Sequence, residues 1–503
     1  MIHMPYLLLQ IVAVPLVASL AMLLVRPGKN RQPAWIAIAA ISYTTLLLVL
    51  AGLRVTAGEV IHEPYPVGPD FNFNLSADGL SLPVGLIINL VCLALSFYSI
   101  HYVEHRIELI YGELDDATHG VYYRRFFLLY MYFPAGFMGV CFASNLLAVY
   151  FFLELLTIIP LYFIMAQFGY SDYITRYNVA LMCLYWGIAG ALLFLVGIIW
   201  SFTQIGSFEI DHLPRLAGNP LALWIAAVIL VGLATKLAIV PLHVWMPWVH
   251  AEHPTCIAGL LAIYANIAAY VAVRVLILPL RGDIRPLSLP LMIFALVTMT
   301  YGSVLTLAQS DAKRFCACST ISQISYSVFG IAAMTAWGVQ GGIFYFLSHI
   351  LGKAILFSTA GILVFKLETR NLKEMGGLWS QMPLTAVLWF SAALILSALP
   401  PTGGFVGKWL LFAGAFKGYA ANTWALLVII MAILSTLLTL VYTFLTGIRI
   451  FFGGKRTGNP GHIVTDPPLT MSLPLLALAG VAVAMGGYPG PVLLLLRSVI
   501  GGF

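Results

Sequence analysis

The chain has 503 residues, of which 61% are hydrophobic and only 9% charged, and its formal net charge is +6. Soluble globular chains carry about 25% charged residues, so this composition excludes a soluble enzyme with one membrane anchor, and also a disordered protein. Apolar runs of about 20 residues exclude an outer-membrane barrel, whose strands alternate in polarity. The sequence therefore predicts an all-helical polytopic membrane protein.

Fourteen apolar segments are each long enough to cross a bilayer, for which about 20 residues are needed. In chain order they lie near 6–25, 34–53, 80–100, 126–142, 145–168, 179–201, 222–248, 255–277, 287–309, 319–336, 338–365, 384–414, 423–448 and 471–494. The pair Cys316 and Cys318 lacks the four-ligand set of a zinc or iron–sulfur site. We therefore predict no metal or redox cofactor on this chain.

The connecting segments carry most of the basic residues, and these predict the orientation of the chain. With the amino terminus outside, fifteen fall in inside segments: Arg26, Lys29, Arg31, Arg106, Arg124, Arg125, Arg176, Lys313, Arg314, Lys366, Arg370, Lys373, Arg449, Lys455 and Arg456. Seven fall outside: Arg54, Arg215, Arg274, Arg281, Arg285, Lys417 and Arg497. Inside loops are enriched in Lys and Arg, so we expect both termini on the outer side. The basic residues are scattered among loops, which argues against nucleic-acid binding.

Four ionisable residues remain inside apolar segments: Glu154, Lys236, Lys353 and Lys408. Each costs roughly 2.5–3.5 kcal/mol in hydrocarbon. They could form buried ion pairs that fix helix register, or they could relay protons or cations through the bundle. We favour the relay because three lysines and one glutamate cannot all neutralise one another. Glu154 and Lys236 have opposite charges, and we expect them to interact.

Prolines and glycines lie beside two of these lysines. Pro241 follows Lys236 in ATKLAIVPLHVWMP, and Pro400 and Pro401 precede Lys408 in SALPPTGGFVGKWLLF. Proline removes a backbone donor, and interrupted helices at bilayer depth are tolerated where they line a cavity. The sequence therefore predicts two broken helices in two related halves of the chain.

A third segment, LSHILGKAILF, places His349 and Lys353 four residues apart, and so on one helical face. Histidine has an ordinary pKa near 6.5, so this pair is suited to proton transfer. The alternative is a packed, hydrogen-bonded histidine. We predict that His349 passes protons between water, Lys353 and Lys408.

These residues lie in motifs that resemble one family, the antiporter-like membrane subunits of respiratory complex I (chain M, or subunit 4), of Mrp antiporters (the D subunit) and of membrane-bound group 4 hydrogenases. The motifs are FNFNLSADGLSLP at 71–83, NLLAVYFFLELLTIIP at 145–160, ATKLAIVPLHVWMPWVHAEHPT at 234–255, DAKRFCACSTISQISY at 311–326, LSHILGKAILFSTAG at 347–361, LKEMGGLWSQMPLTA at 372–386 and SALPPTGGFVGKWLLF at 397–412.

The resemblance implies about fourteen transmembrane helices with two inverted five-helix repeats and broken helices 7 and 12. The implied parts are N-terminal helices 1–3 at 1–125, a first ion-translocating repeat at 126–278, a second at 279–450, and a C-terminal helix at 451–503. It further implies an ion-translocation path whose residues are Glu154, Lys236, His243, His250, Asn266, His349, Lys353 and Lys408.

Four positions depart from the family pattern. Complex I chain M usually has glutamate at the position of Lys408, where a lysine is more typical of the Mrp and hydrogenase subunits. Asn266 stands where the family has a lysine, and WMPWVHAEHP has Trp248 and His253 where Asp and Ala are frequent. An amide can hold water but cannot store a proton. We therefore expect ordered water at Asn266, with Lys236 and His250 as the titrating ends; the alternative is that Asn266 bonds a neighbouring helix.

Three functions are compatible with this pattern. The first is a proton- or sodium-translocating subunit of a redox-driven complex, with iron–sulfur or other redox centres on a peripheral arm and with further antiporter-like and small membrane subunits as partners. The second is a subunit of an Mrp-type sodium/proton antiporter without redox partners. The third is a non-conducting structural homologue. No redox catalysis is expected on the chain itself, and the location expected is the cytoplasmic (inner) membrane.

Overall fold

The computed structural model describes residues 4–68, 72–454 and 464–502. Two of the cations used for orientation, Lys455 and Arg456, lie outside these ranges.

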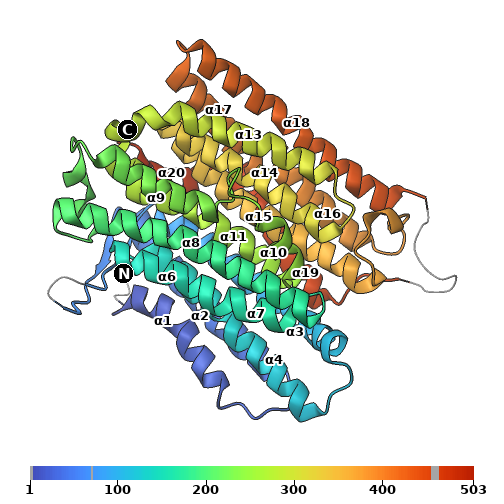
Figure 1. Ribbon diagram of the computed structural model, residues 1–503. Coiled ribbons are helices and arrows are strands. Elements are labelled where there is room, and N and C mark those ends of the chain that lie inside the picture. Colours follow the sequence, from blue (N-terminus) through green and yellow to red (C-terminus); the bar gives the residue numbers. More distant parts are fainter. Residues whose placement is uncertain (1–3, 69–71, 455–463, 503) are drawn as a thin grey trace. The chain divides into compact units, whose positions relative to one another are not determined.

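The described chain is almost entirely helical (Figure 1). The α-helices are α1 (Leu7–Met22), α2 (Gln32–Thr56), α3 (Ser81–Tyr111), α4 (Asp116–Tyr130), α5 (Tyr132–Phe142), α6 (Leu146–Leu156), α7 (Phe163–Phe168), α8 (Tyr173–Ile205), α9 (Ala222–Lys236), α10 (Met246–Glu252), α11 (Thr255–Ala272), α12 (Leu278–Ile284), α13 (Ser288–Leu307), α14 (Ala312–Ala332), α15 (Ala336–Leu367), α16 (Pro383–Leu396), α17 (Gly403–Tyr419), α18 (Thr423–Phe452), α19 (Leu469–Gly487) and α20 (Gly490–Ile500). Shorter 3₁₀ or π segments are η1 (Thr157–Tyr162), η2 (Ile210–Leu216), η3 (Val273–Ile277), η4 (Arg285–Leu287) and η5 (Leu372–Glu374), and two strands are β1 (Ile61–Glu63) and β2 (Leu75–Ala77).

Ten helical segments of the described chain are long and apolar enough to cross a membrane, and four shorter apolar helices accompany them. In hydrocarbon every backbone polar group needs an internal partner, which a helix supplies within itself. The all-helical, multi-span character predicted from composition is therefore confirmed. The two segments predicted to be broken, 222–248 and 384–414, are each divided between two helices, the first between α9 and α10 and the second between α16 and α17. The number fourteen and the inverted repeats stay predictions.

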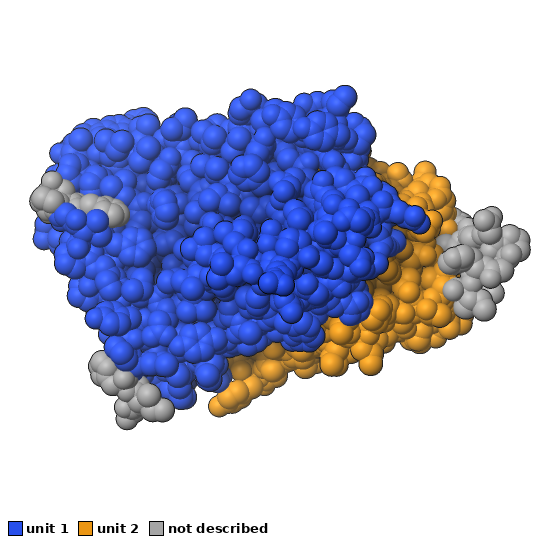
Figure 2. Space-filling model, turned by 90° about the horizontal axis from the view of Figure 1, so that it is seen from below, with its two compact units in different colours: residues 1–237, 267–287, 491–503 blue, residues 238–266, 288–490 orange. Residues whose placement is uncertain are grey.

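The chain forms two compact units, coloured separately in Figure 2. Unit 1 comprises residues 1–237, 267–287 and 491–503, and unit 2 comprises residues 238–266 and 288–490.

In unit 1, α8 and α9 approach closely through glycines. A Cβ added to Gly232 would lie 2.7 Å from the carbonyl oxygen of Gly190, and one added to Gly190 would lie 2.9 Å from that of Gly232. Because neither glycine has a side chain, the two backbones can pack directly against each other, as in membrane helix pairs with small residues at the contact. This contact fixes the last turns of α9 before its end at Lys236.

Unit 2 is built on α13, α14, α15, α17 and α18, which enclose one cluster of buried side chains. The large members of this cluster are Met292, Met299, Tyr326, Phe329, Tyr345, Leu411, Phe412 and Ile429. Helix α15 is buried along almost its whole length, with every residue from Gly338 to Val364 buried. Its side chains therefore face protein on all sides, including the polar residues His349 and Lys353.

Two interruptions divide the predicted broken helices at corresponding places. Helix α9 ends at Lys236 and α10 begins at Met246, while α16 ends at Leu396 and α17 begins at Gly403. The second residue after each helix end is an alanine with positive φ, Ala238 at 52° and Ala398 at 57°. L-residues rarely adopt this conformation, so its recurrence marks the same kind of turn. Lys236 lies just before the interruption between α9 and α10, and Lys408 lies after the interruption between α16 and α17.

A partly buried ion pair ties the segment before α3 to η3 within unit 1. The Arg274 guanidinium donates to both Asp78 oxygens, at 2.6 Å and 2.7 Å. Asp78 also accepts from the backbone amides of Leu80 and Ser81 and so begins α3. Burial raises the pKa of the Asp78 carboxyl, but the Arg274 charge and these hydrogen bonds outweigh burial and lower the pKa from 3.8 to about 2.

This depressed pKa predicts a loss of stability in acid. The stabilising contribution of Asp78 should be complete above about pH 4 and lost as the pH falls toward 2, because protonation then removes the pair. The shift corresponds to about 2 kcal/mol. Thermal unfolding in mild detergent should show Asp78→Asn less stable than the parent by at least this amount at pH 7. The difference should shrink steadily below pH 4; a difference that does not change with pH would contradict the assignment.

Candidate functional site

Unit 1 contains one buried pair of opposite charges at the end of an interrupted helix. The Lys236 ammonium lies 2.9 Å from Oε1 of Glu154, and the two side chains are 1% and 10% exposed. The ammonium also lies 3.4 Å from the Thr157 hydroxyl. Lys236 is the last residue of α9, where helical carbonyls lack intrahelical donors and a positive charge is favoured. Lys236 therefore lies between a helix end and the Glu154 carboxylate.

The partner carboxylate is placed by an irregular helix. Glu154 lies near the end of α6, and the next six residues, from Thr157 to Tyr162, form the π-helix η1, which contains Pro160. Proline cannot donate a backbone hydrogen bond, and π-helical segments occur frequently at functional sites. The proline was visible in the sequence, but the change of helix type was not.

In unit 2, Lys408 lies on α17, after the second interruption, and reaches back to the end of α16. The ammonium donates to the carbonyl oxygen of Leu396, the last residue of α16, at 3.2 Å. The phenol of Tyr345 donates to the same oxygen, also at 3.2 Å. The Lys408 ammonium lies over the Tyr326 ring, 3.8 Å from its centroid, which adds a cation–π contact. Within the described residues, therefore, the partners of Lys408 are neutral groups.

Lys353 is fully buried and is also bound by neutral oxygens. Its ammonium donates to the Cys316 carbonyl at 3.1 Å and to the Ser319 hydroxyl. It lies 6.0 Å from the centroid of the Phe357 ring, one turn further along α15. His349 lies one turn earlier on α15, and its ring stacks on Tyr345 at 6.3 Å. Tyr345 thus contacts both His349 and the helix end that holds Lys408.

Asn266 on α11 contacts His349 on α15, whereas the histidine predicted as a titrating end near Asn266 was His250. The Asn266 amide nitrogen lies 2.6 Å from Nδ1 of His349 and donates to the carbonyl of Ala262 at 3.0 Å. An amide nitrogen only donates, so Nδ1 of His349 accepts and the neutral ring carries its proton on Nε2. This Nε2 and the Asn266 oxygen have no hydrogen-bond partner among the described residues. Such groups are suited to hold water.

The two other predicted histidines lie apart from this contact. His243 is in the segment between α9 and α10, half-buried, with its ring 4.9 Å from Tyr301. His250 is on α10, completely buried, with its ring 5.5 Å from Phe357. In the part of the chain that the structure describes, neither ring nitrogen of His250 has a hydrogen-bond partner.

The structure also places residues that the sequence analysis missed. Lys313 was counted as a loop cation because it lies beside Asp311 and Arg314, but it is completely buried in the first turn of α14 and donates to the His253 carbonyl. Gln323 donates to the Tyr442 hydroxyl at 2.6 Å and accepts from Tyr345. A buried glutamine in a Ser-rich helix has no charge to reveal it, so the residue pattern gave no signal.

These contacts bring ionisable and polar groups together in two sets. In unit 1, the Lys236 ammonium and the Glu154 carboxylate lie 2.9 Å apart. In unit 2, Tyr345 contacts His349 and the helix end that holds Lys408, and Lys353 lies on the same face of α15 as His349. Buried ionisable groups inside apolar spans mark ion pathways. The chemistry available is therefore proton or cation transfer.

Comparison with known proteins gives consistent similarities. Residues 143–439 match the family described as NADH:quinone oxidoreductase/Mrp antiporter, TM. The NADH-quinone oxidoreductase subunit M of Pseudomonas aeruginosa is 29% identical over 96% of this chain and 94% of the relative. A chain in the Mrp complex from Dietzia sp. superposes with a TM-score of 0.85, at 21% identity over 99% of this chain and 97% of that one. A chain of respiratory complex I from Thermus thermophilus gives 0.83, at 22% identity over 98% and 99%.

The buried pair predicts a non-additive pattern of stability. Glu154→Gln should lower the free energy of unfolding by about 3 kcal/mol, because it leaves a buried ammonium without its carboxylate. The double variant Glu154→Leu with Lys236→Met should recover most of that loss, since it removes both charges. Thermal unfolding in detergent measures all variants. Additive losses in the double variant would mean that the two side chains do not act as a pair.

Proposed function

The chain belongs to the NADH:quinone oxidoreductase/Mrp antiporter membrane family and is a multi-pass integral membrane protein, and we propose that it is the proton- or sodium-translocating subunit of a redox-driven membrane complex. The observation that carries this proposal is the buried Glu154–Lys236 pair at the end of an interrupted helix. A structural role alone does not require an ammonium at that point, because apolar residues of similar volume would pack at no net cost.

In this proposal the residues of each unit act as proton stores. Lys236 and Glu154 exchange a proton when the charge on either one is disturbed. In unit 2, a proton leaving Lys408 reaches His349 beside the Tyr345 hydroxyl, and water held at Asn266 and at Nε2 of His349 completes the exchange with Lys353. The remaining family positions, His243 and His250, connect these stores to water. This assignment rests on the hydrogen bonds and ring contacts described above.

Redox centres, on this proposal, lie on a peripheral arm of partner subunits, and other antiporter-like and small membrane subunits lie beside this chain. The similarity to a subunit of NADH-quinone oxidoreductase supports such an assembly. The membrane proposed is the cytoplasmic (inner) membrane with both termini outside, because the loop cations are unequally distributed.

A second candidate function is a subunit of an Mrp-type sodium/proton antiporter without redox partners. Lys408 favours it, because complex I chain M-type subunits usually have glutamate at this position. Identification of the subunits that co-purify in mild detergent separates the two. Iron–sulfur proteins in stoichiometric amount support the redox-driven complex, and their absence from an intact, transport-competent complex supports the antiporter.

Replacing the buried lysine of α17 should stop transport. We expect Lys408→Met to reduce coupled ion transport at least tenfold in vesicles that contain the purified complex, because its methyl end cannot carry a proton. Lys417→Met is the matched control: Lys417 lies nine residues later on the same helix and is exposed over the Trp337 ring. It should retain transport. Equal rates in the two variants would refute the role of Lys408, provided that subunit composition is unchanged.

Replacing the amide beside His349 should also impair transport. Asn266→Leu removes the donor to His349 Nδ1 and the oxygen that can hold water, so we expect transport to fall about tenfold or more. Asn266→Lys restores the residue that the family resemblance implies and should retain most activity. Proton uptake by the same vesicles measures both variants. Full activity in Asn266→Leu would show that the route does not pass this residue.

A further inference from the structure

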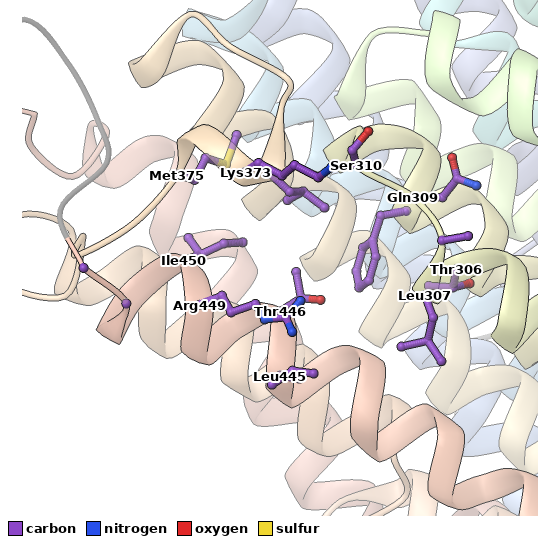
Figure 3. A pocket seen from close by; sticks show the side chains of 15 residues that line it. Thr306, Leu307, Gln309, Ser310, Lys373, Met375, Leu445, Thr446, Arg449 and Ile450 are labelled. Carbon is purple, nitrogen blue, oxygen red and sulfur yellow. The ribbon is translucent and has the colours of Figure 1, made fainter.

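A cavity of about 580 Å³ lies in unit 2 beside the ends of α13 and α18 (Figure 3). Its wall includes Thr306 and Leu307 at the end of α13. It also includes four residues of α18 and the two glycines that follow this helix: Leu445, Thr446, Arg449, Ile450, Gly453 and Gly454. Spanning helices end near the membrane–water interface, so a cavity at two such ends is at interfacial depth. It shares no residue with the ion-translocation set.

The walls are held in place by backbone hydrogen bonds on both sides. The amide of Leu372 donates to the Ser310 carbonyl at 2.7 Å, and Asp311 forms an ion pair with Arg370 at 2.7 Å. On the other side, the amide of Trp379 donates to the Phe451 carbonyl at 2.9 Å. The segment that contains Lys373 is therefore anchored to both the α13–α14 turn and the end of α18. The cavity is therefore formed by segments that hydrogen bonds and an ion pair hold in place.

Two cations line the cavity without a carboxylate partner. Lys373 and Arg449 are both exposed, and neither forms an ion pair or side-chain hydrogen bond with another described residue. The neighbouring carboxylates are engaged elsewhere: Asp311 with Arg370, and Glu374 with Asn371 and Thr369. A cavity with two free cations attracts an anion, and the side chains of Gln309, Ser310 and Thr446 add hydrogen-bonding groups for its oxygens.

Exposed apolar and aromatic side chains lie beside the cavity, where they can pack against acyl chains. Leu445 lines the cavity and is 38% exposed, and Ile448 on the same helix is 49% exposed. Trp379 and Phe452 stack with ring centroids 5.0 Å apart and are 44% and 55% exposed. Exposed aromatic residues of this kind are enriched at membrane–water interfaces. A ligand with an anionic head and an apolar tail matches both parts of the surface.

We propose that this cavity binds the phosphate of an anionic phospholipid, with Arg449 and Lys373 on the phosphate oxygens and the acyl chains along the exposed side of α18. Arginine and lysine are the usual partners of phosphate groups, and basic pockets between membrane helices bind anionic headgroups. Free phosphate has the same charge chemistry but no tail to contact Leu445 and Ile448. The apolar rim therefore favours a phospholipid over free phosphate as the ligand.

Native mass spectrometry of the full chain in mild detergent tests the proposal, with phosphatidylglycerol, phosphatidylcholine and inorganic phosphate as separate probes. We expect one phosphatidylglycerol to bind more tightly than either other probe. Lys373→Gln and Arg449→Gln should each weaken it about fivefold, and the double variant about 25-fold. The matched controls Lys417→Gln and Arg497→Gln remove exposed cations that do not line the cavity and should bind as the parent does.

Thr446→Trp keeps both cations but fills the cavity, so it should also lose the bound lipid. Unchanged phosphatidylglycerol binding in the double variant, or equal losses in the control variants, would overturn the site. Inorganic phosphate binding as tightly as phosphatidylglycerol would overturn the lipid as its ligand. If the double variant does not fold, the single variant Lys373→Gln decides, because Lys373 is exposed on the short segment η5. Its failure to weaken binding would equally refute the proposal.

Discussion

An ammonium group buried among apolar helices must find acceptors, and a helix end offers carbonyls that have no intrahelical partner. The structure provides such ends because α9 and α16 stop inside apolar segments. Lys408 donates to the last carbonyl of α16, and Lys236, the last residue of α9, donates to the Glu154 carboxylate. An interior carbonyl can also accept a second hydrogen bond, as the Cys316 carbonyl of α14 does from Lys353. The interruptions therefore supply an acceptor for one buried lysine and place another beside a carboxylate.

The two interruptions satisfy this constraint in different ways. In unit 1 the lysine and the helix end belong to the same helix, and a carboxylate from α6 completes the site. In unit 2 the lysine comes from the helix after the interruption, and a tyrosine phenol shares the carbonyl with it. A carboxylate holds a proton on its partner more strongly than neutral oxygens do. The same backbone turn therefore supports one charge-paired site and one with neutral partners.

Much of this arrangement was predictable from the sequence because hydrocarbon makes ionisable residues conspicuous. Glu154 and Lys236 stand out as opposite charges in apolar segments, and Pro241, Pro400 and Pro401 mark the interruptions. Partner identity was not predictable. Asn266 contacts His349 from another helix, which depends on helix packing. Lys313 was misjudged because adjacent charged residues made its segment resemble a loop.

The neutral environment of Lys353 and Lys408 has a consequence for which ions can occupy unit 2. In the described structure no carboxylate pairs with either ammonium, so when both are protonated the interior of this unit carries uncompensated positive charge. Like charges repel strongly where water is scarce. A further cation close to these two ammonium groups is therefore disfavoured while both are protonated. In the function proposed above, charge repulsion alone would link the release of a lysine proton to the arrival of another cation.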